Sequence, residues 1–186
     1  MNGQLARRLF TSAEFHRMGE TGILDVNDRL ELVDGEVVRM SPIGSRHAAC
    51  VRRLTALFGR RLRDGASVSV QNPVLLGRHT EVQPDMALLR PCADAYAQHH
   101  PGPADTLLIV EVVDSSGEYD RRTKLPLYAR ARIPEVWLVD LPGAAVEVYR
   151  SPSLRTYRDR QHLVRGERLS PRAFPRVWFR VNDILG

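Results

Sequence analysis

The spacing of apolar residues predicts an amphipathic helix that begins after Ser45. Apolar side chains recur there every three or four residues, which places them on one face of a helix: Val51, Leu54, Phe58 and Leu62. We expect this face to be buried and the helix to end at Asp64-Gly65. Near the N-terminus, Thr11-Ser-Ala-Glu14 has the spacing of a capping box and predicts a shorter helix through Met18.

A hairpin is predicted between these two helices. The runs 29–33 and 36–40 flank Asp34-Gly35, a pair that favours a two-residue turn because both central positions need a positive φ. The sequence therefore predicts an N-terminal β-hairpin.

Longer apolar runs predict buried strands. Residues 106–113 are almost entirely apolar apart from Glu111, which is typical of a central strand covered on both faces. We read residues 81–89 as the strand that carries Asp85, and residues 91–105 as a loop with a helical turn at 93–98. A helix is expected before Pro134. The remaining predicted strands are 68–71, 74–76, 135–140 and 146–150.

Composition indicates an ordinary globular protein. The 186 residues are 43% apolar and 26% charged, and without repeats or linkers we expect one domain over residues 1–186, with 1–10 as a flexible arm. Because the chain has no apolar run of about 18 residues and no charged-then-apolar leader, we expect a cytoplasmic protein that does not enter a membrane. Cys50 and Cys92 match no metal-binding spacing.

The net charge of +5 is compatible with a polyanionic partner such as DNA. Arginines gather on the second face of the helix predicted after Ser45, which is either a solvated surface or a surface for phosphates. These residues are Arg46, Arg52, Arg53, Arg60, Arg61 and Arg63.

Three charged residues suggest chemistry. Asp85 and Glu111 each lie within an apolar run, and buried carboxylates are rare unless they pair with a cation or bind a metal. Lys124 is the single lysine in a chain with 26 arginines. An ammonium is a compact point charge that guanidinium does not replace. The competing interpretation is that both acids are structural and form hydrogen bonds or ion pairs with the backbone or with Arg.

These residues and their flanks resemble the PD-(D/E)XK nuclease superfamily, and in particular its Uma-type endonuclease family. The likeness covers roughly residues 10–150 and rests on an ordered set of segments: 31–36, 40–42, His47, 83–85, 109–113, 120–124, Tyr128 and 133–140. It implies an α/β fold, a restriction-endonuclease-like mixed central sheet flanked by helices. It also implies a metal-dependent endonuclease that hydrolyses phosphodiester bonds in DNA.

The resemblance implies Mg²⁺, or Mn²⁺, as the cofactor. Such an ion takes oxygen ligands and keeps several waters, so Asp85, Glu111 and the backbone carbonyl of Val112 suffice as protein ligands. It can activate water and offset charge on the phosphate.

The chain departs from the superfamily motif at Val113, where the motif has its lysine. The resemblance implies that Lys124 reaches the site from the following helix instead, with Tyr128 on the same helical face. Lys124 can act as a base only if its pKa falls from about 10.4. Because Pro126 favours a first turn, the helix is expected to begin either near Glu118 or near Thr123, which would put Lys124 at the helix entrance.

Several other residues are candidates for the site. His47 falls in the first turn of the helix after Ser45 and is either a site residue or a structural hydrogen-bond partner. For Glu31 and Glu36 the hairpin pattern does not show which acid points inward, so the hairpin surface is the competing interpretation. Gln83, one pleat from Asp85, is a candidate for binding water or phosphate.

Two further hypotheses compete with a nuclease. A nuclease-fold protein without activity would bind DNA or a partner, and the missing lysine at Val113 favours it. Glycoside hydrolysis by a carboxylate pair leaves the lysine without a role. A homodimer is expected by analogy, with the segment 177–181 either as its interface or as an added strand of the chain's own sheet.

Overall fold

The strands of the protein form two main sheets in the computed structural model, which describes residues 7–25, 27–114 and 117–186. The larger sheet has six strands in the order β10-β9-β8-β7-β6-β3. Its members are β3 (Ser67–Ser69), β6 (Met86–Leu89), β7 (Thr106–Val113), β8 (Glu135–Asp140), β9 (Ala145–Pro152) and β10 (Tyr157–Val164).

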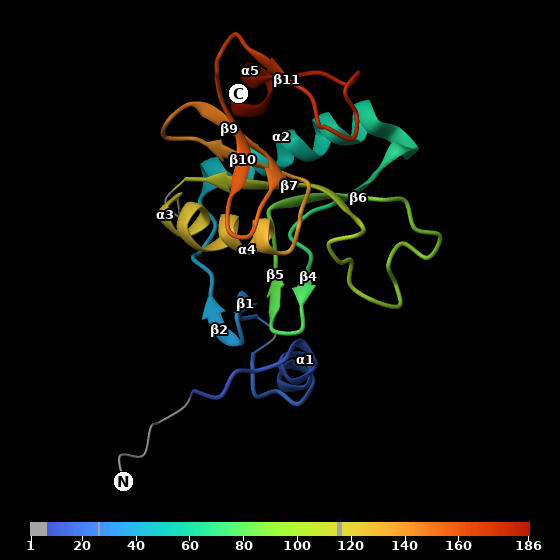
Figure 1. Ribbon diagram of the computed structural model, residues 1–186, viewed down its shortest axis with the longest axis vertical. Coiled ribbons are helices and arrows are strands. Elements are labelled where there is room, and N and C mark those ends of the chain that lie inside the picture. Colours follow the sequence, from blue (N-terminus) through green and yellow to red (C-terminus); the bar gives the residue numbers. More distant parts are fainter. Residues whose placement is uncertain (1–6, 26, 115–116) are drawn as a thin grey trace.

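The larger sheet is mixed, as predicted. β7 and β8 are parallel, with Glu111 paired to Leu138, and the other neighbouring strands are antiparallel. A parallel pair needs a crossover, and the helical segment between the two strands supplies it (Figure 1). β7 lies inside the sheet and is buried along almost all its length, which confirms the predicted central strand.

The smaller sheet contains the predicted hairpin. Its order is β2-β1-β5-β4, formed by β1 (Leu30–Val33), β2 (Glu36–Arg39), β4 (Val74–Gly77) and β5 (Thr80–Val82). Asp34 and Gly35 have φ values of 50° and 84°, as the two-residue turn requires. The hairpin is therefore confirmed.

Helix α1 (Ser12–Glu20) lies beyond the smaller sheet, at the end of the molecule away from the larger sheet (Figure 1). Thr11 and Glu14 form the predicted capping box, and the helix extends two residues past the predicted end at Met18. The first six residues of the predicted flexible arm lie outside the described part of the chain. In the rest of the arm, the Phe10 amide donates to the Gly35 carbonyl over 2.9 Å.

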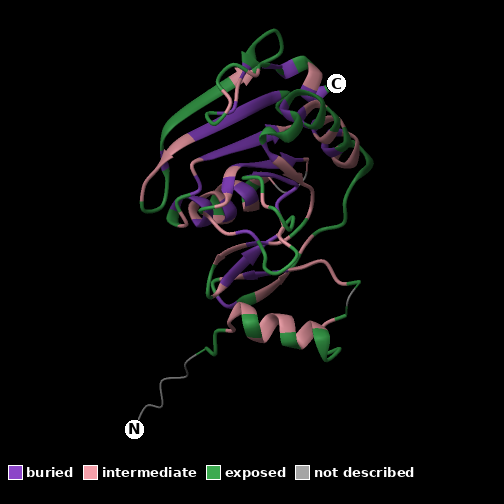
Figure 2. Cartoon of the chain, turned by 90° about the vertical axis from the view of Figure 1, so that its right-hand side faces the viewer, coloured by how far each residue is buried: buried purple, intermediate pink, exposed green. Residues whose placement is uncertain are grey.

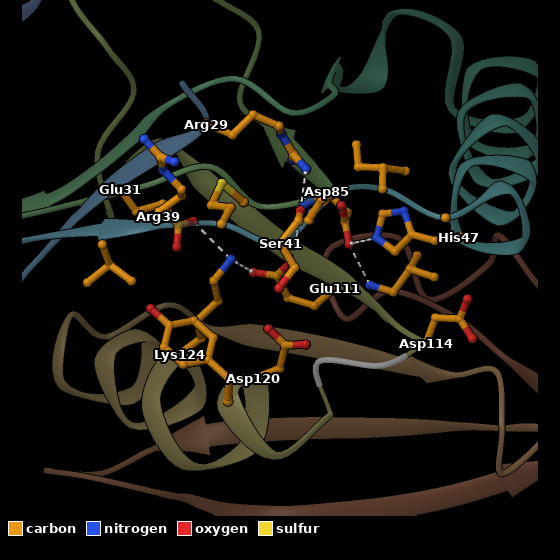
Figure 3. A pocket seen from close by; sticks show the side chains of 17 residues that line it. Arg29, Glu31, Arg39, Ser41, His47, Asp85, Glu111, Asp114, Asp120 and Lys124 are labelled. Atoms are coloured by element: carbon orange, nitrogen blue, oxygen red, sulfur yellow. Dashed lines mark hydrogen bonds and ion pairs between the residues drawn. The ribbon is translucent and has the colours of Figure 1, made fainter. Parts of the chain in front are cut away.

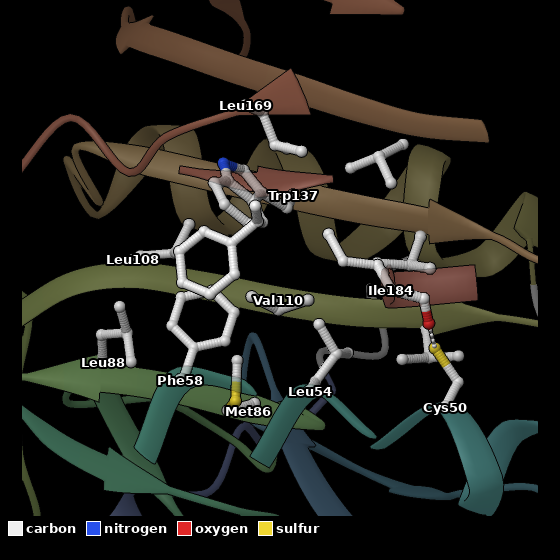
Figure 4. Packing of buried hydrophobic residues seen from close by; sticks show 14 of the residues in the cluster. Cys50, Leu54, Phe58, Met86, Leu88, Leu108, Val110, Trp137, Leu169 and Ile184 are labelled. Atoms are coloured by element: carbon white, nitrogen blue, oxygen red, sulfur yellow. Dashed lines mark hydrogen bonds between the residues drawn. The ribbon is translucent and has the colours of Figure 1, made fainter. Parts of the chain in front are cut away.

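Two clusters of buried apolar residues pack on the larger sheet, whose central strands are buried along most of their length (Figure 2). Helix α2 (Ser45–Leu62) buries the four predicted apolar residues and Cys50 on one face. Figure 4 shows Phe58 and Leu54 packed over Val110 and Trp137. Alternate residues of β7 face the other cluster, which includes helix α4 (Leu125–Arg130). Glu111 follows this alternation toward α4.

One predicted strand is wrong. Residues 81–89 do not form a single strand, because β5 ends at Val82 in the smaller sheet and β6 begins at Met86 in the larger one. Pro84 cannot donate a ladder hydrogen bond, and Asp85 lies at the bend just before β6. Asp85 is thus fixed where the chain passes between sheets.

The helical segment after β7 begins at Gly117, so the alternative start near Thr123 is wrong. It runs through α3 (Gly117–Tyr119), a π-helical turn (Asp120–Lys124) and α4. In the π turn the Leu125 amide donates to the Asp120 carbonyl. The widened turn accommodates Pro126 inside the helix. Lys124 therefore lies within the helical segment and not at its entrance.

The C-terminal tail packs against its own chain. β11 (Arg168–Leu169) and β12 (Phe179–Arg180) form a two-stranded sheet, followed by α5 (Val181–Leu185). Phe179 is fully buried and stacks on Phe58 with a centroid distance of 4.3 Å. The segment 177–181 therefore contributes to the core, and its strand β12 pairs with β11 instead of extending one of the two main sheets. Its part in a dimer interface stays a prediction.

The remaining expectations concern connections. Residues 91–105 form a loop as predicted. The helical turn expected at 93–98 is instead a pair of tight turns. In these turns the backbone amides of Ala95 and Ala97 donate to the carbonyls of Cys92 and Asp94, respectively.

Candidate active site

A cavity of about 420 Å³ lies where the two sheets, the start of α2 and the helical segment meet. Its walls carry charged side chains from all four elements (Figure 3). Asp85, Glu111, Lys124 and His47, which are separate in the sequence, all line it. Val112 also lines the cavity.

Asp85 is held by four neighbours. Its Oδ2 accepts from the Val112 amide and lies next to His47 Nε2, each at 2.8 Å, while Oδ1 accepts from Gln71 Nε2 at 3.3 Å. The Asp85 amide donates to Glu111 Oε2 over 3.2 Å. The two predicted metal-ligand carboxylates are therefore adjacent, because β6 and β7 are neighbouring strands.

Glu111 is almost completely buried, with 3% of its surface exposed. Its Oε1 accepts from Lys124 Nζ over 3.2 Å and from the Tyr128 hydroxyl. Burial nevertheless dominates and raises the pKa of Glu111 to about 8, although the nearby Lys124 ammonium opposes this rise. Tyr128 is fully buried and does not line the cavity.

Lys124 joins the smaller sheet to the helical segment. Its Nζ lies 2.9 Å from Glu31 Oε1 as well as 3.2 Å from Glu111. Burial by itself would lower the pKa of Lys124, but the carboxylates of Glu111 and Glu31 outweigh it and raise that pKa. Lys124 therefore carries a positive charge and lacks the lowered pKa that a general base needs.

The structure separates the two hairpin acids. Glu31 is 1% exposed and lines the cavity, whereas Glu36 is exposed and pairs with Arg7 on the surface. Strand alternation does not separate them, because Glu36 pairs with Val33 and therefore lies on the same face of the hairpin as Glu31. Glu36 differs in lying next to the turn on the edge strand β2, outside the cavity lining. Glu36 is therefore not part of this site.

Gln83 is also outside the cavity lining. The backbone amide of Gln83 donates to Glu31 Oε1 over 2.8 Å, and its side-chain Nε2 donates to the Leu30 carbonyl. The expected pleat relationship with Asp85 fails because the strand is broken between them. Gln83 instead holds Glu31 in place.

Sequence reasoning missed several residues of the cavity. Asp120 is buried, and its position four residues before Lys124 was the available signal. Arg29 and Arg39 line the mouth at the ends of the hairpin strands, where Arg29 Nη1 donates to the Ser41 carbonyl over 3.1 Å. Tyr119 is a further lining residue, and burial raises its pKa to about 12.

The buried lining has an excess of negative charge. It holds four carboxylates against a single ammonium, which gives three net negative charges when all acids are ionised and His47 is neutral. These groups are Glu31, Asp85, Glu111, Asp120 and Lys124.

Three buried polar atoms of this lining have no hydrogen-bond partner within the described residues: Glu31 Oε2, His47 Nδ1 and the Tyr119 hydroxyl. Unsatisfied buried polar atoms are costly. The oxygen-rich donor set and the charge excess fit a hard divalent cation with its waters.

The fold and this site together define the class of restriction-endonuclease-like nucleases. The family model of Uma2, described as "Putative restriction endonuclease", matches residues 12–182. The chain belongs to that family.

The likeness to solved structures agrees with the fold. A crystal structure from Anabaena variabilis, described as "a putative nuclease belonging to DUF820", superposes with a TM-score of 0.72 at 12% identity, covering 95% of this chain and 97% of that chain. No curated protein matches the chain. Among the described residues, no helix is both long and apolar enough to cross a membrane.

Proposed function

We propose that this protein is a divalent-metal-dependent endonuclease that hydrolyses phosphodiester bonds in DNA. The observation that carries the proposal is the convergence of Asp85, Glu111 and Lys124, from three separate segments, in one cavity with an excess of negative charge. Family membership supports a nuclease in general. The metal and the DNA substrate are inferences from the site.

Asp85, Glu111 and the Val112 carbonyl are the proposed ligands of Mg²⁺ or Mn²⁺. When bound, such an ion would supply activation of a water and compensation of charge on the phosphate. The hydrogen bonds from the Val112 amide and from Gln71 fix the Asp85 carboxylate before any ion arrives. Such preorganisation reduces the cost of assembling the site.

Lys124 is proposed to orient the attacking water and to screen the scissile phosphate. Its raised pKa keeps the ammonium charged, so it acts electrostatically and not as a base. Glu31 and Tyr128 are positioning residues in this scheme. Glu31 holds the Lys124 ammonium and Tyr128 donates to the Glu111 carboxylate.

His47 is proposed to position Asp85 through Nε2. Its other ring nitrogen, Nδ1, is buried in the lining without a partner among the described residues. Nδ1 is therefore available to a water or a phosphate oxygen. With that second contact, His47 would act at the site and not only as a structural partner of Asp85.

DNA is the proposed substrate because the mouth of the cavity is basic. Arg29 is partly exposed and Arg39 is exposed, and both line the cavity together with the buried carboxylates. Such an arrangement would attract a phosphodiester backbone and place one phosphate at the acids. The cytoplasm is the proposed location. A homodimer, in which two sites cut two strands, is proposed by analogy and light scattering of the pure protein would test it.

A protein that binds DNA without cutting it is the competing function, because Val113 occupies the usual lysine position. The contact between Lys124 and Glu111 favours activity, since it brings an ammonium to the same carboxylate by another route. The two functions differ in whether DNA is cleaved when metal is bound.

The test combines calorimetry with cleavage. Mg²⁺ and Mn²⁺ are titrated into the wild type and into Asp85→Asn and Glu111→Gln, and each protein is incubated with plasmid and single-stranded DNA. We expect saturable binding in the wild type, lost in both variants, and cleavage that follows it. Carboxylate-dependent metal binding without cleavage would favour the binding module, and folded protein with no such binding would refute the nuclease.

A further inference from the structure

A second group of metal-ligating side chains lies outside the cavity. His16 on α1, Glu81 on β5 and His100 in the loop before β7 place one ligand atom each within 4.8 Å of the others. His16 Nε2 is 2.7 Å from Glu81 Oε2, and the two histidine rings meet edge to face with centroids 5.3 Å apart. We propose that these three residues bind a transition-metal ion of the Zn²⁺ type.

The two sites use opposite faces of the smaller sheet. Glu81 is paired with Leu32, and side chains of directly paired residues lie on the same face. Glu31 precedes Leu32 in the strand and therefore points to the other face, where it contacts Lys124. Glu81 thus points away from the cavity, toward the side where α1 lies (Figure 1).

The ligand types separate this site from the cavity in chemistry. Two imidazoles and one carboxylate suit Zn²⁺ and its neighbours in the first transition row, whereas Mg²⁺ selects oxygen ligands. Ligand atoms about 2.0–2.1 Å from a tetrahedral ion lie about 3.3 Å from one another. The observed separations, from 2.7 Å to at most 4.8 Å, bracket that value, so small side-chain shifts complete the site.

The three proposed ligands differ in their exposure to solvent. Glu81 is 4% exposed, and a buried carboxylate favours a cationic partner. His16 is partly exposed and His100 is exposed, so an ion can enter from solvent. Three protein ligands leave a fourth position for water.

The site would link two segments with few buried residues to the sheet. None of the residues of α1, all of them described, is buried, and His100 belongs to a long loop without helix or strand. An ion bound by all three residues links α1, β5 and that loop, and it stabilises the folded arrangement by mass action. This inference does not rest on the proposed nuclease activity.

Zinc titration in an Asp85→Asn background tests the site, because that substitution weakens the cavity as a competing metal site. Zn²⁺ is titrated by calorimetry at about pH 7.5, where histidine is mostly neutral, and Co²⁺ is followed by its visible absorption. His100→Gln is the main variant, because substitutions of exposed residues usually change stability little, and thermal unfolding verifies that it folds. His99→Gln, the neighbouring exposed histidine, is the matched control.

We expect one equivalent of Zn²⁺ in the Asp85→Asn protein and in its His99→Gln derivative. His100→Gln should lower the affinity by more than about 100-fold, beyond the cost of losing an outer-shell partner, and should abolish the cobalt spectrum. His16→Gln should do the same. Zinc affinity that is equal in the His99 and His100 variants, or absent from the parent, would overturn the proposal.

Discussion

The Nζ atom of Lys124 lies 2.9 Å from Oε1 of Glu31. This contact connects the helical segment to the N-terminal hairpin and brings a further carboxylate to the predicted trio. Both side chains are almost completely buried. Glu31 thus controls where the ammonium lies relative to Glu111.

Glu31→Gln should reduce DNA cleavage by about 10- to 100-fold, the usual cost of losing a partner that orients a functional group. The amide keeps the shape but removes the charge that holds Lys124. Plasmid nicking under saturating Mg²⁺ measures the effect. Glu36→Gln, on the neighbouring strand and exposed, is the control and should cleave at the wild-type rate. Equal rates in both variants would contradict the role of Glu31.

Lys124→Met should lower single-turnover cleavage by about 100- to 1000-fold, comparable to removing one preorganised electrostatic donor. Lys124→Arg should not restore the rate, because the larger planar guanidinium does not fit a position that is 4% exposed between two acids. Metal binding should persist in both variants. Full activity of Lys124→Met would exclude the lysine from the mechanism.

The pKa of Glu111 predicts how the metal-free protein responds to pH. Its pKa in the folded state is raised from 4.5 to about 8, so the folded protein holds a proton that the unfolded chain has lost. Stability should therefore fall as pH rises from about 4.5 to about 8, by at most about 1.4 kcal/mol per pH unit. Urea unfolding without metal measures it.

Glu111→Gln supplies the control for that experiment, because it cannot ionise and should lack this part of the pH dependence. Adding Mg²⁺ to the wild type should restore stability at pH values near 8, since the ion replaces the proton. A wild type and variant with the same pH profile would show that Glu111 titrates normally.

The capping box at the start of α1 predicts a local effect. Thr11→Ala removes the cap and should cost about 1 kcal/mol, seen as roughly fivefold faster amide hydrogen exchange in α1. Ser12→Ala, one residue later and not the cap, is the control and should have little effect.

Hydrogen bonds from the Thr11 backbone and from Arg8 hold the pKa of Glu14 at about 2. The contribution of the ionised Glu14 to the stability of α1 should therefore vanish only as pH falls from about 4.5 toward 2.

The packing of the tail predicts a contrast between adjacent aromatic residues. Phe179→Ala should lower the free energy of unfolding by about 3–5 kcal/mol, because Phe179 is fully buried against Phe58. Trp178→Ala should cost about 1 kcal/mol or less, since Trp178 is 46% exposed and contacts Arg168. Urea unfolding compares them. Similar costs would show that the tail is not part of the core.

Much of the fold was predictable because local patterns agree with tertiary packing. The apolar stripe of α2, the Asp34-Gly35 turn and the apolar run of β7 each depend on a period or a turn geometry within a few residues. The break at Pro84 was missed although Gln83, Pro84 and Asp85 interrupt the apolar pattern, and a proline within a run argues against a continuous central strand. The π turn before Pro126 was also missed. It is defined by a backbone hydrogen bond between two residues five positions apart, Leu125 and Asp120.

The sequence by itself determined which residue types are present: two acids in apolar runs, one lysine and a histidine at a helix start. Only the tertiary structure decided which acids face the cavity. Glu31 and Glu36 are equivalent in a hairpin pattern without a clear apolar face, and the stacking of the hairpin against the helical segment buries Glu31 with Lys124 while leaving Glu36 in solvent. Metal chemistry depends on distances between distant segments, and local sequence patterns carry no such distances.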